Sequence, residues 1–212
     1  MINYKSLLID RIESILYVTT NLKTNNALGW IGGNPPEYFD NHLISKENNN
    51  YSFYLSLLNP FDEERMISIF IPDYDSYLEH AIYPDCSIKV FEHPTTQESE
   101  LSNLKSSFMI DKKYIIQSRI CNTDEAINIP YLIKFGGTPD FIQQKEYYYK
   151  NLDNDGFKFL FQIDEGGYPD GLIKGNYPFS FGGVYIYANI TLNNFSNPIA
   201  GFWQILDCII YF

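Results

Sequence analysis

The chain has 212 residues, 45% of them hydrophobic, so it can bury a substantial core without metals or disulfides. Its formal net charge of −11 argues against nucleic acid or anionic membranes as partners, because both require clustered lysine and arginine side chains. Aromatic residues make up 17% of the chain, with 18 Tyr and 16 Phe, and this usage favours β-strands over helices.

The N-terminal segment from Tyr4 to Tyr17 is predicted to form an amphipathic helix, since its apolar residues recur at helical spacing. Charges at Lys5, Asp10, Arg11 and Glu13 interrupt the segment, which therefore lacks the apolar region of a signal peptide. No window of the chain reaches the ~18 consecutive apolar residues that a membrane-spanning helix needs. We therefore expect a cytoplasmic protein.

Two nearly identical tetrapeptides occur in the chain: GGNP begins at Gly32 and GGTP begins at Gly136, 104 residues later (136 − 32). Glycine adopts positive φ and proline fixes φ at about −65°, so each motif predicts a tight turn followed by an extended chain. Extended segments occur in the same order around both motifs, at residues 17–23, 51–59 and 66–72 and again at residues 114–120, 156–164 and 184–190. The sequence therefore predicts a duplicated module, with residues 1–106 as an acidic first repeat and residues 107–212 as the second, fused into one compact unit.

The segment between the two repeats, residues 94–108, is predicted to form a connecting helix. Its apolar residues share one helical face, and Thr95 and Glu98 have the spacing of a capping box. Together, these elements predict an α+β fold, in which strand-rich antiparallel sheets are accompanied by a few helices.

Several short motifs resemble the YwqG-like bacterial family of unknown function. Four motifs of the second half resemble that family's pattern: KFGGTPDFIQ at residues 134–143, FKFLFQID at 157–164, GGVYIYANI at 182–190 and GFWQ at 201–204. In the first half, WIGGNPPEYF at residues 30–39 matches it more weakly. The resemblance implies an α+β fold rich in antiparallel strands, a cytoplasmic location and no established enzymatic activity. Members of this kind are also met beside bacterial polymorphic toxins, which implies an immunity role.

The best catalytic candidates are two adjacent carboxylates, Asp164 and Glu165, at the end of a predicted strand beside a glycine-containing loop. Paired carboxylates can act as general acid and base when their surroundings keep one protonated and the other ionised. Neighbouring residues on a strand point to opposite faces, however, so the pair can act together only where the strand has already ended. A hydrolytic or ligand-processing enzyme near residues 162–171 is therefore kept as the alternative function.

A ligand groove is a second candidate site. Gln162 and Gln204 stand in aromatic-rich strands, where a buried amide must find hydrogen-bond partners. They are either structural amides that tie strands to loops or the polar part of a groove lined by Tyr185, Tyr187 and Trp203.

The third candidate is an acidic surface in the first half. Residues 60–100 hold ten acidic side chains against two basic ones, Arg65 and Lys89. Such charges either solvate loops or form a negative patch that steers a basic protein partner, with nearby tyrosines as anchors. The residues predicted to contact the partner are Asp73, Tyr74, Asp75, Tyr77 and Glu79.

The sequence therefore favours a non-enzymatic binding protein that neutralises a toxin or another basic protein partner. His42, His80 and His93 show none of the spacings typical of a metal site, and neither glycine pair precedes a convincing helix that could hold a phosphate. We accordingly expect no metal and no cofactor.

Overall fold

The computed structural model describes residues 2–41, 51–72, 80–109 and 111–206. Ten strands form the fold: β1 (Glu13–Thr20), β2 (Ala27–Ile31), β3 (Tyr51–Asn59), β4 (Asp62–Pro72), β5 (Lys89–Pro94), β6 (Lys113–Asn122), β7 (Ile133–Phe135), β8 (Lys158–Asp164), β9 (Gly183–Ile190) and β10 (Phe195–Gln204). The helical elements are short: η1 (Lys5–Ile9), η2 (Glu37–Asn41), α2 (Thr123–Ala126), η3 (Glu146–Tyr148), α3 (Lys150–Asn154) and η4 (Glu165–Gly167). None of the helices in these ranges is long and apolar enough to cross a membrane.

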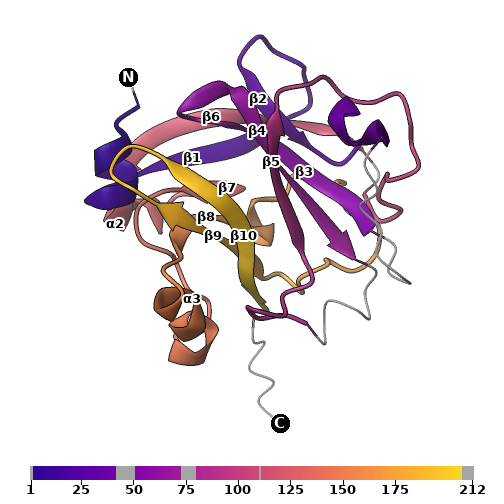
Figure 1. Cartoon of the computed structure of the whole chain (residues 1–212). Coiled ribbons are helices and arrows are strands. Elements are labelled where there is room, and N and C mark those ends of the chain that lie inside the picture. The colour runs from indigo at the N-terminus through magenta and orange to yellow at the C-terminus, as the bar shows by residue number, and fades with distance from the viewer. Residues whose placement is uncertain (1, 42–50, 73–79, 110, 207–212) are drawn as a thin grey trace.

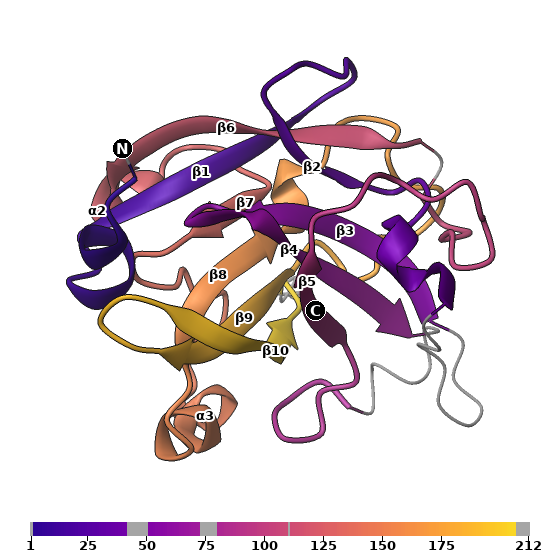
Figure 2. The same cartoon turned by 45° about the horizontal axis from the view of Figure 1, so that its top comes forward.

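The ten strands form one antiparallel sheet with the order β10-β9-β8-β7-β1-β6-β2-β3-β4-β5. β1 and β6 lie in the middle, and the strands that follow each of them run outward in sequence to one edge (Figures 1 and 2). β1 pairs with β7 of the second half, whereas β6 pairs with β2 of the first half. Each half thus contributes its first strand to the other. The duplication itself stays a prediction, and this strand order supports it.

The sheet curls until its edge strands, β5 and β10, lie close to each other (Figures 1 and 2). The segment before β5 bridges the remaining gap: the backbone N–H of Trp203 donates to Ala81 (3.1 Å), and that of Tyr83 donates to Gly201 (2.7 Å). These hydrogen bonds occupy backbone groups of an edge strand that could otherwise pair with another chain.

Apolar clusters cover both faces of the sheet. The largest cluster fills the inside of the curled sheet with residues from both halves, among them Tyr54, Ile69, Phe135 and Ile163. Two smaller aromatic clusters lie elsewhere on the sheet, one around Phe53 and the other beside α3. Since each fully buried aromatic or branched side chain contributes about 1.5–3 kcal/mol, these three clusters supply most of the driving force for folding.

The predicted α+β fold is wrong, because the structure is 44% strand and only 14% helix and is thus nearly all-β. The segment predicted as an N-terminal helix instead forms the short η1 and then β1. Ile15 and Tyr17 of β1 join the inner cluster, while Leu16 contacts an outer one, so this strand is buried on both faces. Such a strand has a continuous run of apolar residues, and that run also contains the spacing expected of an amphipathic helix. The predicted connecting helix is also absent from the described residues. Thr95 donates to the carbonyl of Glu63 rather than capping a helix.

The two GG-x-P motifs form similar turns, with positive φ at both glycines of each pair (69° and 74° at Gly32 and Gly33, 74° and 65° at Gly136 and Gly137). The second turn is also crowded. A Cβ on Gly137 would lie 2.2 Å from Ser14 Oγ and 2.4 Å from Thr123 Oγ1. Only glycine therefore satisfies both the backbone conformation and the space at this position.

Replacing Gly137 with Ala is expected to destabilise the protein by about 2–4 kcal/mol, the sum of left-handed backbone strain and overpacking. Gly156→Ala is the matched control, because Gly156 also has positive φ (82°) but nothing lies within 4 Å of its added Cβ. The control should lose only ~1–2 kcal/mol. Urea unfolding measures both values, and equal losses would contradict the crowding at Gly137.

Candidate functional site

The predicted partner-contacting residues cannot be placed, since Asp73, Tyr74, Asp75, Tyr77 and Glu79 lie outside the described residues. The nearby tip of the β3–β4 hairpin is described and exposes three consecutive acidic residues, Asp62, Glu63 and Glu64. The structure thus shows exposed acidic residues at this hairpin, whereas the partner-contacting surface around residues 73–79 stays a prediction.

The five residues predicted to line a groove are all buried, with exposed fractions between 0% and 6% (Gln162, Tyr185, Tyr187, Trp203 and Gln204). The structure does not bring them together around one cavity. Trp203 packs in the inner cluster, whereas Tyr185 and Tyr187 belong to the outer cluster beside α3. Tyr187 also borders a shallow hollow that Arg11 and Phe141 help to line.

The two buried amides hold the loop after the second GG-x-P turn against the sheet. Gln162 Oε1 accepts from the backbone N–H of Asp140 (2.7 Å) and its Nε2 donates to Tyr131 Oη (2.9 Å). Gln204 binds the backbone of Gln143 in the same two-sided way, at 3.0 and 2.8 Å. Both ends of each amide are therefore engaged, and the bond to Gln162 fixes the position of Asp140.

Asp140 is the centre of a polar network on the outer face of the sheet, opposite the inner cluster. Lys134 of β7 lies in register with Gln162 of β8, and it is fully buried. Its Nζ is 2.7 Å from Asp140 Oδ1, and Tyr131 Oη donates to Asp140 Oδ2 (2.9 Å). This ion pair offsets the free-energy cost of burying the lysine charge, because within the described residues Lys134 Nζ has no hydrogen-bond partner.

A wide, shallow cavity of about 360 Å³ lies above this network, and we refer to it as the acidic cavity. Its lining residues are Ile127, Asn128, Ile129, Pro130, Tyr131, Asp140, Asp164, Gly166 and Gly167. The charged side chains among them are the two carboxylates, whereas Ile127, Ile129 and Pro130 provide an apolar wall. The cavity therefore combines negative charge with an apolar surface.

Asp164 differs from Asp140 in that the hydrogen bond to its carboxylate comes from a backbone N–H and not from a charged side chain. Its Oδ1 accepts from the backbone N–H of Gly166 (2.7 Å), and it caps η4. Burial raises the pKa of Asp164 and the negative charge of Asp140 raises it further, while the Gly166 hydrogen bond partly offsets both effects. A cation bound in the cavity would stabilise the ionised form of Asp164 and so counteract the effects of burial and of Asp140.

Glu165, the other catalytic candidate, lies outside this cavity. Its side chain is 2% exposed, and it accepts from the backbone N–H groups of Phe179 (2.8 Å) and Gly182 (3.2 Å). Burial raises its pKa to about 7, although those hydrogen bonds lower it in part. Tyr168 donates to the same carboxylate and also bonds the buried Tyr54. Asp164 and Glu165 therefore do not share a site, and Glu165 holds the 178–182 loop.

Sequence reasoning missed Tyr131 and Asp140, which line the acidic cavity, and Lys134, which pairs with Asp140. One signal was present, because Lys134 interrupts the apolar segment YLIKFGG immediately before the turn. A charge in such a segment requires a partner when the strand is buried on both faces. The sequence does not show that the partner is Asp140. No group of three or more His, Cys, Asp or Glu side chains in the described ranges is arranged to hold a metal ion.

Comparison with known proteins provides no family assignment for the chain. No protein-family model matches it, and no curated protein matches it either. The resemblance to the YwqG-like family therefore stays a prediction.

Proposed function

We propose that the protein is a cytoplasmic, non-enzymatic binding protein of the immunity type, and that its acidic cavity receives a lysine or arginine side chain of a basic protein partner. The observation that carries the proposal is the lining of this cavity. The carboxylate of Asp164 faces it together with an apolar wall, Asp140 lies beside it with its charge offset by Lys134, and no lysine or arginine is among the described lining residues. A long basic side chain has the matching chemistry, since its aliphatic stem packs on apolar surface while its charged end pairs with carboxylates.

The state of the two carboxylates favours binding over catalysis. Asp140 already pairs with Lys134 and accepts from Tyr131, so both of its oxygens are engaged in fixed contacts. Glu165, which has the pKa of a general acid or base, is directed into backbone N–H groups instead. A hydrolytic site would need titratable groups that converge on one reacting atom.

The overall charge supports a basic partner. With a formal net charge of −11 and a sequence pI of about 4.6, the protein attracts positively charged proteins over long range. The exposed Asp62, Glu63 and Glu64 add to this attraction in the described part of the first half. Electrostatic steering accelerates encounter, and a buried ion pair at the acidic cavity would then slow dissociation.

Asp164→Asn should abolish capture of the partner without unfolding the protein, because it removes the charge and keeps the shape. The measurement is a pull-down of the tagged protein from its own host at low and high salt, with captured chains identified by mass. Asp170→Asn is the matched control, since Asp170 is exposed, lies in the same loop region and does not line the cavity. A basic protein captured by wild type and by the control, but not by Asp164→Asn, would support the proposal. Equal capture by both variants would contradict it.

A further inference from the structure

A second cavity of about 360 Å³ lies over β2 in the first half, and we refer to it as the Trp30 cavity. It stands at the place equivalent to the acidic cavity in the second half. Trp30 precedes Gly32 by two residues, as Lys134 precedes Gly136, and in the sheet Trp30 pairs with Ser56 as Lys134 pairs with Gln162. When Trp30 is aligned with Lys134 and Ser56 with Gln162, three pairs of equivalent residues line the two cavities: Lys23 and Ile127, Ala27 and Tyr131, and Leu58 and Asp164.

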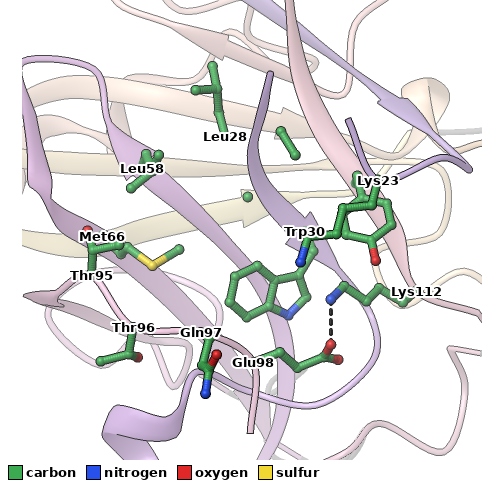
Figure 3. Close-up of a pocket in the computed structure, with 13 residues that line it drawn as sticks. Lys23, Leu28, Trp30, Leu58, Met66, Thr95, Thr96, Gln97, Glu98 and Lys112 are labelled. Carbon is green, nitrogen blue, oxygen red and sulfur yellow. Dashed lines mark hydrogen bonds and ion pairs between the residues drawn. The ribbon is translucent and has the colours of Figure 1, made fainter. Parts of the chain in front are cut away.

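The Trp30 cavity has an apolar floor and wall. Figure 3 shows the Trp30 ring lying across the cavity, with Leu58 and Met66 on one side and Lys112 on the other. The indole N–H donates to the carbonyl of Asn34 (2.9 Å), which fixes the ring. An apolar body the size of an aromatic ring has a preformed surface to pack on here.

The charge of the Trp30 cavity is opposite to that of the acidic cavity. The charged residues among its described lining are Lys23, Lys112 and Glu98, so positive charge exceeds negative by one. Both oxygens of Glu98 are engaged, one by Lys112 and the other by the backbone N–H of Asn34 (2.9 Å). Its negative charge is therefore already compensated within the protein.

Two ammonium groups border the Trp30 cavity. Lys112 Nζ lies 4.9 Å from the centroid of the Trp30 ring and 4.7 Å from that of Tyr114, which holds the ammonium group in place at the cavity. Lys23 is exposed at the cavity, and the hydroxyl-bearing Thr95 and Thr96 line the opposite side. Because Lys112 and Glu98 offset each other, a cationic ligand would meet the net repulsion of Lys23, whereas an anion would meet its net attraction.

We infer that the Trp30 cavity binds a small ligand that carries a carboxylate on an apolar body. The body packs against Trp30, Leu58 and Met66, and the carboxylate pairs with Lys23 and Lys112. The two halves thus hold equivalent cavities of opposite selectivity, one for a cationic side chain and one for a carboxylate. This inference does not depend on the proposed function of the acidic cavity.

The test is a titration of the ¹⁵N-labelled full chain with phenylacetate, followed by NMR. The chain has two tryptophans, Trp30 and Trp203, so its spectrum offers one indole N–H signal at the cavity and one in the inner cluster as an internal control. Phenylacetate should shift the Trp30 signal in a saturable manner and leave the Trp203 signal in place. Phenethylammonium, which pairs a similar body with the opposite charge, should bind at least tenfold more weakly.

Lys23→Met should weaken phenylacetate binding roughly threefold to fivefold, the size expected for an exposed ion pair. Lys150→Met, at an exposed lysine on α3, is the control and should leave the affinity unchanged. Stronger binding of phenethylammonium, no saturable shift of Trp30, or equal affinities of the two variants would each overturn the inference. None of these outcomes bears on capture of a partner at Asp164.

Discussion

Asp140→Asn should destabilise the protein by about 3–5 kcal/mol, because it leaves the fully buried ammonium group of Lys134 without a counter-charge. Asparagine preserves the shape of the side chain, so the loss reports charge rather than packing. Urea unfolding of wild type and variant measures the difference.

The matched variant is Lys134→Met combined with Asp140→Asn, which removes both charges and keeps a long side chain at residue 134. Replacing a buried ion pair with uncharged groups of similar volume is often nearly neutral, so the double variant should recover most of the lost stability. If Asp140→Asn costs less than ~1 kcal/mol, or if the double variant is no more stable than the single one, the buried pair does not hold this part of the sheet together.

The second large effect is a dependence of stability on pH that originates at Glu165. Its pKa is about 7 in the folded protein against an ordinary value of 4.5, so the folded state retains the proton that the unfolded state has already lost. The stabilising contribution is therefore complete below about pH 4.5 and is lost as the pH rises through about 7. At ~1.4 kcal/mol per pKa unit, the free energy of unfolding should fall by roughly 2–3 kcal/mol between pH 5 and pH 8 from this group.

Glu165→Gln removes the titration while keeping a side chain of the same length, although its NH₂ group then faces one of the backbone N–H groups that the carboxylate accepts. The variant should be less stable than wild type at pH 5 and should show a flatter pH profile. Urea unfolding at several pH values gives both curves. Parallel curves for the two proteins would show that Glu165 is not the titrating group.

Much of the strand pattern follows from the sequence, because it is encoded locally. The strand predicted at residues 51–59 is confirmed in full as β3, and those predicted at 114–120 and 184–190 lie within β6 and β9. Sequence reasoning misread the first part of β1 as helix, although the strand predicted at residues 17–23 overlaps its end. This strand, β1, lies between β6 and β7, contacts apolar clusters on both faces and therefore lacks the alternation that marks a half-buried strand.

The acidic cavity could be predicted only in part. Asp164 was a candidate because a carboxylate stood at a strand end beside a glycine loop. The role of Asp140 depends on how Gln162 binds its backbone N–H, and that of Lys134 depends on the pairing of β7 with β8. Both contacts join residues far apart in the chain, so spacing in the sequence does not reveal them.

The most direct test of the binding function is the pKa of Asp164, measured by NMR on its carboxyl carbon. A cation that enters the acidic cavity favours the ionised form, so Nα-acetyl-lysine methylamide should lower the pKa of Asp164. The same compound acetylated on its side-chain nitrogen should have no effect. A pKa of Asp164 that does not respond to the lysine compound, or that responds equally to the uncharged one, would contradict the account.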